Sequence, residues 1–403
     1  MHILLIHQAF ASLEEPGGTR HHELARFLAK QGHKVSIIAS RVSYLTGEIQ
    51  KGKRIEEDFS GLIKIHRSYT YSALHRSFFH RVISFFSFMV SSFLKSISIK
   101  NVDLVWGTSP PIFQAVSAWL ISKLKRVPFL LEVRDLWPEF AIAVGVLKNP
   151  FLIKISNWLE KFLYKHADQI IVNSPGFIEL VKEKGGGEIS LIPNGADIAL
   201  FGDINIPEIR KNLGWTDKFI VLYAGAHGMS NDLGAVLEAA QLLKVEKNIH
   251  FIFLGDGKEK SPLIRKAEKM DLPNITFLDP IPKNRVAELL AAADACIAIL
   301  KPIEMYKTTY PNKVFDYMAA RKPVILAIDG VIREVVEKAG CGVFCSPGNP
   351  KALADGIMTL FHNQDEAILM GNNGYDYLKE NFSRKRIAAD LLDVMKKMVN
   401  KHV

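Results

Sequence analysis

Two glycine-rich loops each follow an apolar run and precede a helical one, an arrangement that presents backbone N–H groups to a phosphate. Gly17 and Gly18 follow the first apolar run, and Gly225 and Gly228 follow a run at 219–224. Glycine lets the backbone approach a ligand closely, and the start of a helix carries roughly half a positive charge. We therefore expect both loops to bind an anionic ligand such as a diphosphate. A flexible turn with a capping residue has the same composition.

A longer run, Pro311 to Ile325, reads as a helix that opens at a proline and ends before a strand. Lys313 and Asp316 are three residues apart on this helix and so share a face. A carboxylate here can accept two hydrogen bonds from the hydroxyl groups of a ribose, and a lysine can offset phosphate charge. An exposed ion pair has the same spacing, so the spacing leaves both interpretations open.

Two further loops follow strand-like runs. Gly255 and Gly257 flank Asp256 in a fragment of a dinucleotide fingerprint, but no third glycine follows. Farther along, Ile281 lies between two prolines. That backbone unit is rigid and exposed enough to read the edge of a nucleobase, although prolines also simply end strands.

These loops need elements that position them, and the sequence alternates strands and helices from end to end. Such alternation predicts parallel sheets covered by helices. The first series consists of strands at 2–7, 34–40, 62–67, 103–107, 128–133, 168–172 and 189–192, with helices at 19–31, 77–98, 111–126, 150–166 and 175–184. The second consists of strands at 219–224, 249–254, 275–278, 294–300 and 323–327, with helices at 232–246, 259–270, 366–380 and 384–401.

The length of 403 residues exceeds what one hydrophobic core usually supports. We expect two Rossmann-like, doubly wound α/β domains, at 1–200 and 201–383, with a linker at about 200–217 and a last helix, 384–403, that crosses back to the first domain. Ligands would bind in a central cleft between the carboxyl ends of the two sheets. Three cysteines are too few and too uneven for a disulfide framework, and they are expected to be reduced core residues.

The formal charge of +9 lies mostly in the first half, where 24 lysines and arginines stand against 17 acidic residues. Residues 59–102 contain six lysines and arginines, seven phenylalanines and no acidic residue. Because the aromatic residues lie in an aliphatic helical run, an anionic membrane surface is favoured over nucleic acid as the partner of residues 74–99. The apolar centre at 82–94 is too short to span a bilayer core, which needs roughly 20 residues. Packing of its phenylalanine face on the first sheet is the alternative.

Motifs along nearly the whole chain resemble those of family 4 glycosyltransferases of the GT-B fold, in the subgroup of bacterial polysaccharide transferases typified by the N-acetyl-fucosamine transferases. In family order they are Gly17-Gly18, Glu132-Val-Arg-Asp-Leu-Trp-Pro-Glu139, Ile192-Pro-Asn-Gly-Ala-Asp197, Gly225-Ala-His227-Gly228, Gly255-Asp-Gly257 and Pro311-Asn-Lys-Val-Phe-Asp316 through Pro323.

The chain also departs from the family pattern. The two glutamates that the family spaces eight residues apart are here Thr308 and Asp316. Asp316 can keep the ribose role with a shorter arm, and Glu304 is a candidate for the sugar-hydroxyl role that Thr308 leaves open. The basic pair that usually holds the diphosphate is not evident after Gly228, which leaves Lys307, Lys313 and Arg134 as candidates.

The resemblance implies transfer of a sugar, an N-acetylated or deoxy-amino hexose, from a UDP-sugar with retention of anomeric configuration. The acceptor would be a polyprenyl-diphosphate-linked saccharide for a cell-surface polysaccharide such as O-antigen or capsule. The enzyme would be cytoplasmic and peripheral to the inner face of the plasma membrane. Arg134 and Asp135 directly follow the strand at 128–133, so they would project from its carboxyl end as the catalytic residues. Asp135 would orient the acceptor hydroxyl or steady developing positive charge, unless it only caps a helix.

The chain contains no Asp-x-Asp sequence, the common carrier of a divalent ion on a sugar nucleotide. We therefore expect no metal and no cofactor, with helix ends and cations stabilising the leaving group. A UDP-sugar 2-epimerase or hydrolase on the same fold is the main alternative, and a non-catalytic binding module is a third.

Overall fold

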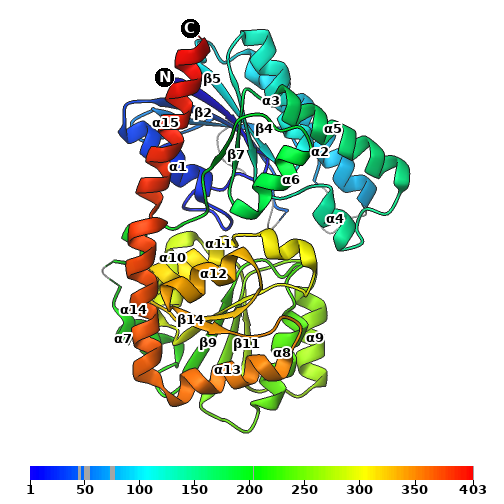
Figure 1. The fold of residues 1–403 in the computed structure, drawn as a ribbon. Coiled ribbons are helices and arrows are strands. Elements are labelled where there is room, and N and C mark those ends of the chain that lie inside the picture. The colour runs from blue at the N-terminus through cyan, green and yellow to red at the C-terminus, as the bar shows by residue number, and fades with distance from the viewer. Residues whose placement is uncertain (44–46, 50–54, 73–77, 203, 403) are drawn as a thin grey trace. The chain divides into compact units, whose positions relative to one another are not determined.

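The computed structural model describes residues 1–43, 47–49, 55–72, 78–202 and 204–402, and the chain divides into two compact units (Figure 1). Unit 1 comprises Met1–Ser12, Gly17–Pro193 and Lys385–Val403, and unit 2 comprises Leu13–Pro16 and Asn194–Arg384. The chain thus changes unit after Pro193, whereas the boundary expected from the sequence is after 200.

Unit 1 contains an eight-stranded sheet in the order β3-β4-β2-β1-β5-β6-β7-β8. All neighbouring strands are parallel except β3, which runs antiparallel to β4 at one edge. The strands are β1 His2–Ile6, β2 Lys34–Ser40, β3 Ile55–Asp58, β4 Ile63–Ser68, β5 Leu104–Ser109, β6 Phe129–Val133, β7 Gln169–Val172 and β8 Ile189–Leu191.

Helices cover both faces of this sheet, and alternate residues of β5 show how. Trp106 belongs to the same buried hydrophobic cluster as residues of α1 and α15, whereas Gly107 faces α3 so closely that a Cβ there would lie 2.5 Å from the Cβ of Ala118. The helices of unit 1 are α1 Arg20–Lys30, α2 Phe78–Ile97, α3 Ile112–Lys125, α4 Glu139–Ala143, α5 Pro150–His166, η1 Pro175–Phe177, α6 Ile178–Glu183 and α15 Arg384–His402. Lys385 to the chain end therefore belongs to the core of unit 1.

Unit 2 contains a six-stranded, wholly parallel sheet in the order β11-β10-β9-β12-β13-β14. Its strands are β9 Phe219–Ala224, β10 Ile249–Leu254, β11 Ile275–Leu278, β12 Ala295–Ile299, β13 Val324–Ala327 and β14 Gly342–Phe344. Its helices are η2 Ile198–Phe201, α7 Ile206–Leu213, α8 Leu233–Leu242, α9 Lys260–Lys269, α10 Lys283–Ala292, η3 Glu304–Thr308, α11 Asn312–Ala319, α12 Val331–Ala339, α13 Pro350–His362 and α14 Gln364–Asn381.

The expected linker at 200–217 lies within unit 2, and its centre forms helix α7, so that prediction is wrong. Asn205 caps the helix by accepting a hydrogen bond from the Glu208 N–H, Pro207 lies in the first turn, and Gly214 ends the helix at φ +67°. Proline at a helix start and glycine just past its end are the usual places for both residues. The composition that suggested a linker therefore marks the two ends of one short helix.

Candidate active site

In unit 2, the loops after β9 and β10 contact each other through their glycines. A Cβ on Gly255 would lie 1.9 Å from the carbonyl oxygen of Gly225, and a Cβ on Gly257 would lie 2.4 Å from that of His227. All three glycines have φ between +140° and +157°, a conformation that residues with a side chain rarely adopt. The fragment at 255–257, weak as a nucleotide signature, is therefore required here for close packing of the two loops.

The His227 side chain lies in the interior and not on the loop surface. Its ring is fully buried, with ring centroids at 5.9 Å from Tyr223 and 6.2 Å from Phe277. Burial lowers its pKa to about 4, and the charges of Lys260 and Lys313 act in the same direction, so the ring is neutral at physiological pH. The backbone N–H of His227 donates to the Asp256 carbonyl oxygen at 2.8 Å. In this loop, Gly228 has the most open surroundings, since a Cβ there would meet only the Asn231 amide, at 3.6 Å.

Lys313, at the start of α11, reaches back to the glycine loop after β9. Its Nζ donates to the hydroxyl of Tyr223 at 2.8 Å and to Oδ1 of Asn231 at 3.3 Å. The same Nζ would lie 3.2 Å from a Cβ on Gly225. Among the residues that the structure describes, Lys313 forms no ion pair with a carboxylate, and burial lowers its pKa to about 7. An ammonium group beside a glycine loop, with only neutral partners, is a site for an anion.

Asp316, one turn farther along α11, faces a different cation. Its Oδ2 accepts hydrogen bonds from Lys283 Nζ at 2.5 Å and from Asn312 Nδ2 at 3.2 Å, and the residue is 9% exposed. Lys313 and Asp316 are therefore not the ion pair that their spacing allowed. Sequence reasoning missed Lys283, although its position at the start of α10, directly after the Pro-Ile-Pro run, was the available signal.

Ile281 and the residues of η3 are the remaining donor-binding residues that the sequence predicts in unit 2. Ile281 is partly buried and packs against the hydrophobic core. In η3, Lys307 Nζ lies 2.8 Å from the exposed carboxylate of Glu304, and Thr308 donates its hydroxyl hydrogen to the Met305 carbonyl oxygen at 2.6 Å. Of the two lysines predicted to hold the diphosphate, Lys307 is thus paired with a carboxylate and Lys313 is not.

In unit 1, the predicted glycine loop leads into α1. Gly17 has φ +143°, and a Cβ there would lie 3.0 Å from the Cβ of Ala11, whereas Gly18 has open space around it. The side chain of Thr19 does not cap the helix, because its hydroxyl donates to Oε1 of Glu23 at 2.5 Å. The backbone at Gly18 is therefore accessible to a ligand.

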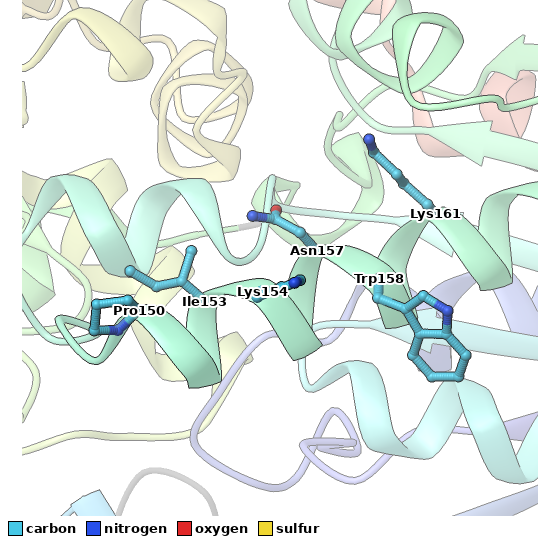
Figure 2. Close-up of a pocket in the computed structure, with 6 residues that line it drawn as sticks. All are labelled: Pro150, Ile153, Lys154, Asn157, Trp158 and Lys161. Carbon is cyan, nitrogen blue, oxygen red and sulfur yellow. The ribbon is translucent and has the colours of Figure 1, made fainter.

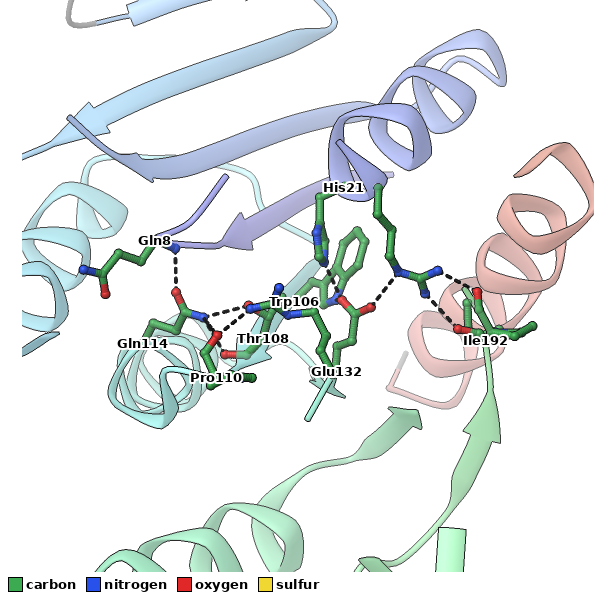
Figure 3. Close-up of polar contacts among 11 residues, drawn as sticks. Gln8, His21, Trp106, Thr108, Pro110, Gln114, Glu132 and Ile192 are labelled. Carbon is green, nitrogen blue, oxygen red and sulfur yellow. Dashed lines mark hydrogen bonds and ion pairs between the residues drawn. The ribbon is translucent and has the colours of Figure 1, made fainter. Parts of the chain in front are cut away.

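A buried carboxylate, Glu132 at the end of β6, organises the polar interior of unit 1 (Figure 3). It accepts hydrogen bonds from Arg20 Nε at 3.2 Å, His21 Nε2 at 2.6 Å and Trp106 Nε1 at 3.1 Å. Although burial opposes ionisation, the charges of His21 and Arg20 hold the pKa of Glu132 well below its usual range. Arg20 also donates to the Ile192 carbonyl oxygen at 2.8 Å, so the network ties α1 to the end of β8. In the sequence Glu132 stands only as one residue of a motif, and no local pattern indicates its role in this network.

Arg134 and Asp135 emerge from the carboxyl end of β6, as expected. Arg134 donates through its backbone N–H to the Ser109 carbonyl oxygen at 2.8 Å and through its guanidinium group to the Pro110 carbonyl oxygen. Asp135 is exposed and the following Leu136 is buried, which anchors the loop. The carboxyl group of Asp135 lies next to a guanidinium group fixed by main-chain oxygens, and desolvation raises its pKa to about 6 although the charge of Arg134 acts in the opposite direction.

His7, a residue outside every predicted motif, lies immediately after β1 and close to His21 and Arg134. Its ring is 1% exposed, and its centroid lies 4.2 Å from that of His21. Neither ring nitrogen has a hydrogen-bond partner in the part of the chain that the structure describes. Burial first, then His21 and Arg134, lower its pKa well below the ordinary value, so it is a neutral imidazole. Its position, directly after the first strand of a parallel sheet, is the feature of the sequence that could have indicated His7 as a functional candidate.

Comparison with known proteins identifies the chain. Residues 17–200 match the family described as Glycosyltransferase Family 4, and residues 205–377 match Glycosyl transferases group 1. The chain belongs to the GT-B glycosyltransferases. It is 27% identical to a probable glycosyltransferase, WbjE, of Pseudomonas aeruginosa over 67% of this chain and 68% of that one. It is 25% identical to a putative colanic acid biosynthesis glycosyl transferase, WcaI, of Escherichia coli strain K12 over 83% of this chain and 86% of that one.

Solved structures support the same fold. Sucrose-phosphate synthase from Thermosynechococcus elongatus superposes with a TM-score of 0.80 at 18% identity, covering 99% of both chains. Alr3699/HepE of Anabaena, in complex with UDP and glucose, superposes with a TM-score of 0.74 at 17% identity, covering 98% of this chain and all of the other. At these identities the likeness establishes the GT-B fold of two parallel-sheet, Rossmann-like domains.

The last residue of the motif at 132–139 takes part in an ion-pair cluster with helix α5. Glu139 and the buried Glu160 of α5 share the ammonium group of Lys184, and Tyr164 donates its hydroxyl hydrogen to Glu160 at 2.7 Å. Burial, reinforced by Glu139, raises the pKa of Glu160 to about 7. Glu139 therefore joins the loop that carries Asp135 to helix α5.

The described residues contain no cluster of three or more His, Cys, Asp or Glu side chains able to hold a metal ion. Cys296, Cys341 and Cys345 are all buried and form no disulfide. Within the same described ranges, no helix is long and apolar enough to cross a membrane.

Proposed function

We propose that the protein transfers a sugar from a UDP-sugar to a hydroxyl group of a polyprenyl-diphosphate-linked saccharide, with retention of anomeric configuration and without a metal ion. The transferred sugar is an N-acetylated or deoxy-amino hexose, in the biosynthesis of a cell-surface polysaccharide such as O-antigen or capsule. Names of similar proteins support this pathway, since WcaI is assigned to colanic acid and TuaH of Bacillus subtilis to teichuronic acid. Alr3699/HepE supports the donor class, because its solved structures contain UDP-glucose or UDP with glucose.

The observation that carries the proposal is the position of Lys313. Its ammonium group lies beside Gly225, bonded only to the neutral groups of Tyr223 and Asn231 among its described contacts. A diphosphate on this loop gains a charge-assisted hydrogen bond and relieves the cost of burying an unpaired ammonium group. Gly225 and Gly228 let the phosphates approach the backbone, and His227 supports the loop from within.

Other residues of unit 2 are assigned to the rest of the donor. Asp316 accepts hydrogen bonds from the ribose hydroxyl groups while Lys283 keeps it ionised and oriented. The backbone at Gly255 and Ile281 lines the nucleoside part, and Glu304, Lys307 and Thr308 face the sugar. Because η3 carries both a carboxylate and a hydroxyl group, it offers two kinds of hydrogen-bond partner to sugar hydroxyls.

In the reaction, the bond between the anomeric carbon and the diphosphate oxygen breaks while the acceptor oxygen bonds to the same face of that carbon. The departing diphosphate oxygen takes the acceptor proton, so no protein nucleophile is needed, and Lys313 stabilises the negative charge that develops. Asp135 orients the acceptor hydroxyl group and Arg134 holds the loop, while the backbone at Gly17 and Gly18 contacts the donor phosphates. The acceptor is met at the inner face of the plasma membrane through residues 74–99, of which 74–77 lie outside the described residues.

Incubation with a panel of UDP-sugars, with and without a polyprenyl-diphosphate-linked saccharide, tests the proposal. Transfer gives a longer lipid-linked saccharide and UDP only when the acceptor is present, and NMR of the product reports the anomeric configuration. A UDP-sugar 2-epimerase or hydrolase would instead change the donor without acceptor. Asp135→Asn is the matched variant, and we expect it to retain UDP binding and lose transfer.

A further inference from the structure

Helix α2 presents a row of apolar side chains outward, whereas three of the four residues in its buried row are serines. The buried row recurs every four residues and consists of Ser84, Phe88, Ser92 and Ser96. The exposed row follows helical spacing and consists of Phe79, Ile83, Phe86, Val90, Leu94 and Ile97, each between 36% and 69% exposed. A helix that covers a sheet in water has the opposite pattern.

Helices α3 and α5 continue this outer surface. Phe86 of α2 packs on Phe113 of α3 with ring centroids at 4.6 Å, and Trp119 of α3 packs on Phe162 of α5 at 4.8 Å. On α3, Leu124 is 59% exposed. The three helices therefore form one layer, and we call its outward side chains the outer helical surface.

Helix α5 contributes the largest exposed side chains. Phe151 is 69% and Trp158 63% exposed, while the inward face contains Ser156 and the ion-paired Glu160. A shallow groove of about 570 Å³ runs along the outward face, lined by Pro150, Ile153, Lys154, Asn157, Trp158 and Lys161 (Figure 2). Phe151, Lys154, Trp158 and Lys161 thus place aromatic and lysine side chains alternately along about three turns of one helix.

The charge on this surface has a single sign. Helices α2, α3 and α5 contain two, two and three lysines or arginines respectively, and their one acidic residue, Glu160, is 1% exposed and shared with Lys184. A second copy of the chain docked by two-fold symmetry would set lysines against lysines. An anionic lipid surface has the complementary charge, and its interfacial region accommodates tryptophan and phenylalanine.

We propose that α5 docks on an anionic lipid bilayer as a second membrane contact beyond residues 74–99, with α3 joining the two. Phe151 and Trp158 enter the interfacial region, and Lys154 and Lys161 contact headgroup phosphates. This deepens the proposed function, because it names the surface on which the lipid-linked acceptor is met. Binding to lipid needs neither donor nor acceptor, so it is measured apart from transfer.

The test is flotation of the full chain with vesicles of phosphatidylglycerol and phosphatidylcholine. The variant is Phe151→Ser, Trp158→Ser, Lys154→Glu and Lys161→Glu, and the matched control is Leu242→Ser, Val245→Ser, Lys247→Glu and Lys269→Glu, exposed positions of unit 2. Each lysine near an anionic leaflet contributes about a fivefold gain in partitioning, so we expect the α5 variant to partition at least about 20-fold less and the control to float as the parent does. Added salt should weaken parental binding, and phosphatidylcholine alone should bind poorly.

Three outcomes would overturn the proposal: unchanged flotation of the α5 variant, an equal loss in the control, or parental binding that is indifferent to lipid charge. Sedimentation velocity tests the alternative occupant, a second copy of the chain. If the parent is a dimer and the α5 variant is a monomer, this surface is an interface between copies. If Lys154→Gln with Lys161→Gln, which changes only two exposed side chains, also fails to reduce binding, the lysines are not headgroup contacts. Loss of UDP binding or transfer, with flotation retained, would count against the proposed function alone.

Discussion

The carboxylate of Asp316 lies 2.5 Å from Nζ of Lys283, a residue 33 positions earlier in the chain. This ion pair joins the start of α10 to α11 and is largely buried, with side-chain exposures of 11% and 12%. Lys283 fixes the orientation of the carboxylate to which we assign the binding of the ribose hydroxyl groups.

We expect Asp316→Ala to weaken UDP binding by roughly 10-fold to 100-fold, because hydrogen bonds to a charged group are worth about 1.5 to 3 kcal/mol. Isothermal titration calorimetry measures the affinity, and circular dichroism checks the fold. Lys283→Met should reduce the affinity less, since it removes the support and not the acceptor. An unchanged affinity for UDP in Asp316→Ala would remove the ribose assignment.

A second prediction concerns Gly255, whose Cβ would lie 1.9 Å from a backbone oxygen. Gly255→Ala should destabilise the protein by more than about 1 kcal/mol, because both φ and the close approach oppose a side chain. Gly228→Ala is the matched control, since its Cβ has ordinary contact distances. Thermal unfolding of both variants compares them, and equal melting temperatures would contradict this account of the loop.

The helices and strands were predictable from the sequence where their periodicity was strong. The ranges 34–40, 249–254, 275–278 and 150–166 coincide with β2, β10, β11 and α5. Sequence reasoning missed β3, because its run Ile-Glu-Glu-Asp is three-quarters acidic. The structure shows that one of these acids pairs with Arg67 at 2.9 Å, a contact made by folding and not by any local pattern.

The candidate site was predictable as far as local spacing carries information. Gly225, Lys313 and Asp316 stand in motifs, and the structure places all three around the strand ends of unit 2. Which cation pairs with which anion depends on tertiary contacts. Spacing along the chain therefore did not reveal Lys283 as the partner of Asp316, and it allowed a pairing of Lys313 with Asp316 that the structure does not contain. An amphipathic period does not say which side of a helix faces the sheet, so the sequence left two orientations of α2 open, and the structure turns Phe79, Phe86 and Leu94 outward.

We predict that catalysis needs no divalent ion, on the ground that the chain lacks Asp-x-Asp and that Lys313 can offset the diphosphate charge. Turnover should be the same with excess EDTA as without it. The matched experiment adds magnesium or manganese to the chelated enzyme. Loss of turnover on chelation that either ion restores would show the prediction to be wrong.

Glu132→Gln should lower the free energy of unfolding by about 3 to 5 kcal/mol, because it leaves the buried guanidinium group of Arg20 without the carboxylate that it pairs with. Glu304→Gln is the control, since its pair with Lys307 is exposed to solvent and such pairs contribute little to stability. Urea unfolding at neutral pH measures both. A loss at Glu132 no larger than that at Glu304 would mean that the buried network contributes little to stability.

The last prediction follows from the lowered pKa of Lys313, about 7 against an ordinary 10.5. A bound diphosphate favours the ammonium form and so raises this pKa in the complex. Above about pH 7 the free protein is largely neutral at Lys313 and must take up a proton on binding, so UDP affinity should fall as pH rises, approaching tenfold per pH unit. Below pH 7 the group is already charged and its contribution levels off.

Calorimetry in buffers of different ionisation enthalpy, at about pH 8, should detect the proton uptake by Lys313. Lys313→Met should bind UDP roughly 10-fold to 100-fold more weakly and lose the proton uptake, whereas Lys307→Met should keep it. If the parent and Lys313→Met show the same uptake, the proton goes elsewhere and Lys313 does not hold the diphosphate.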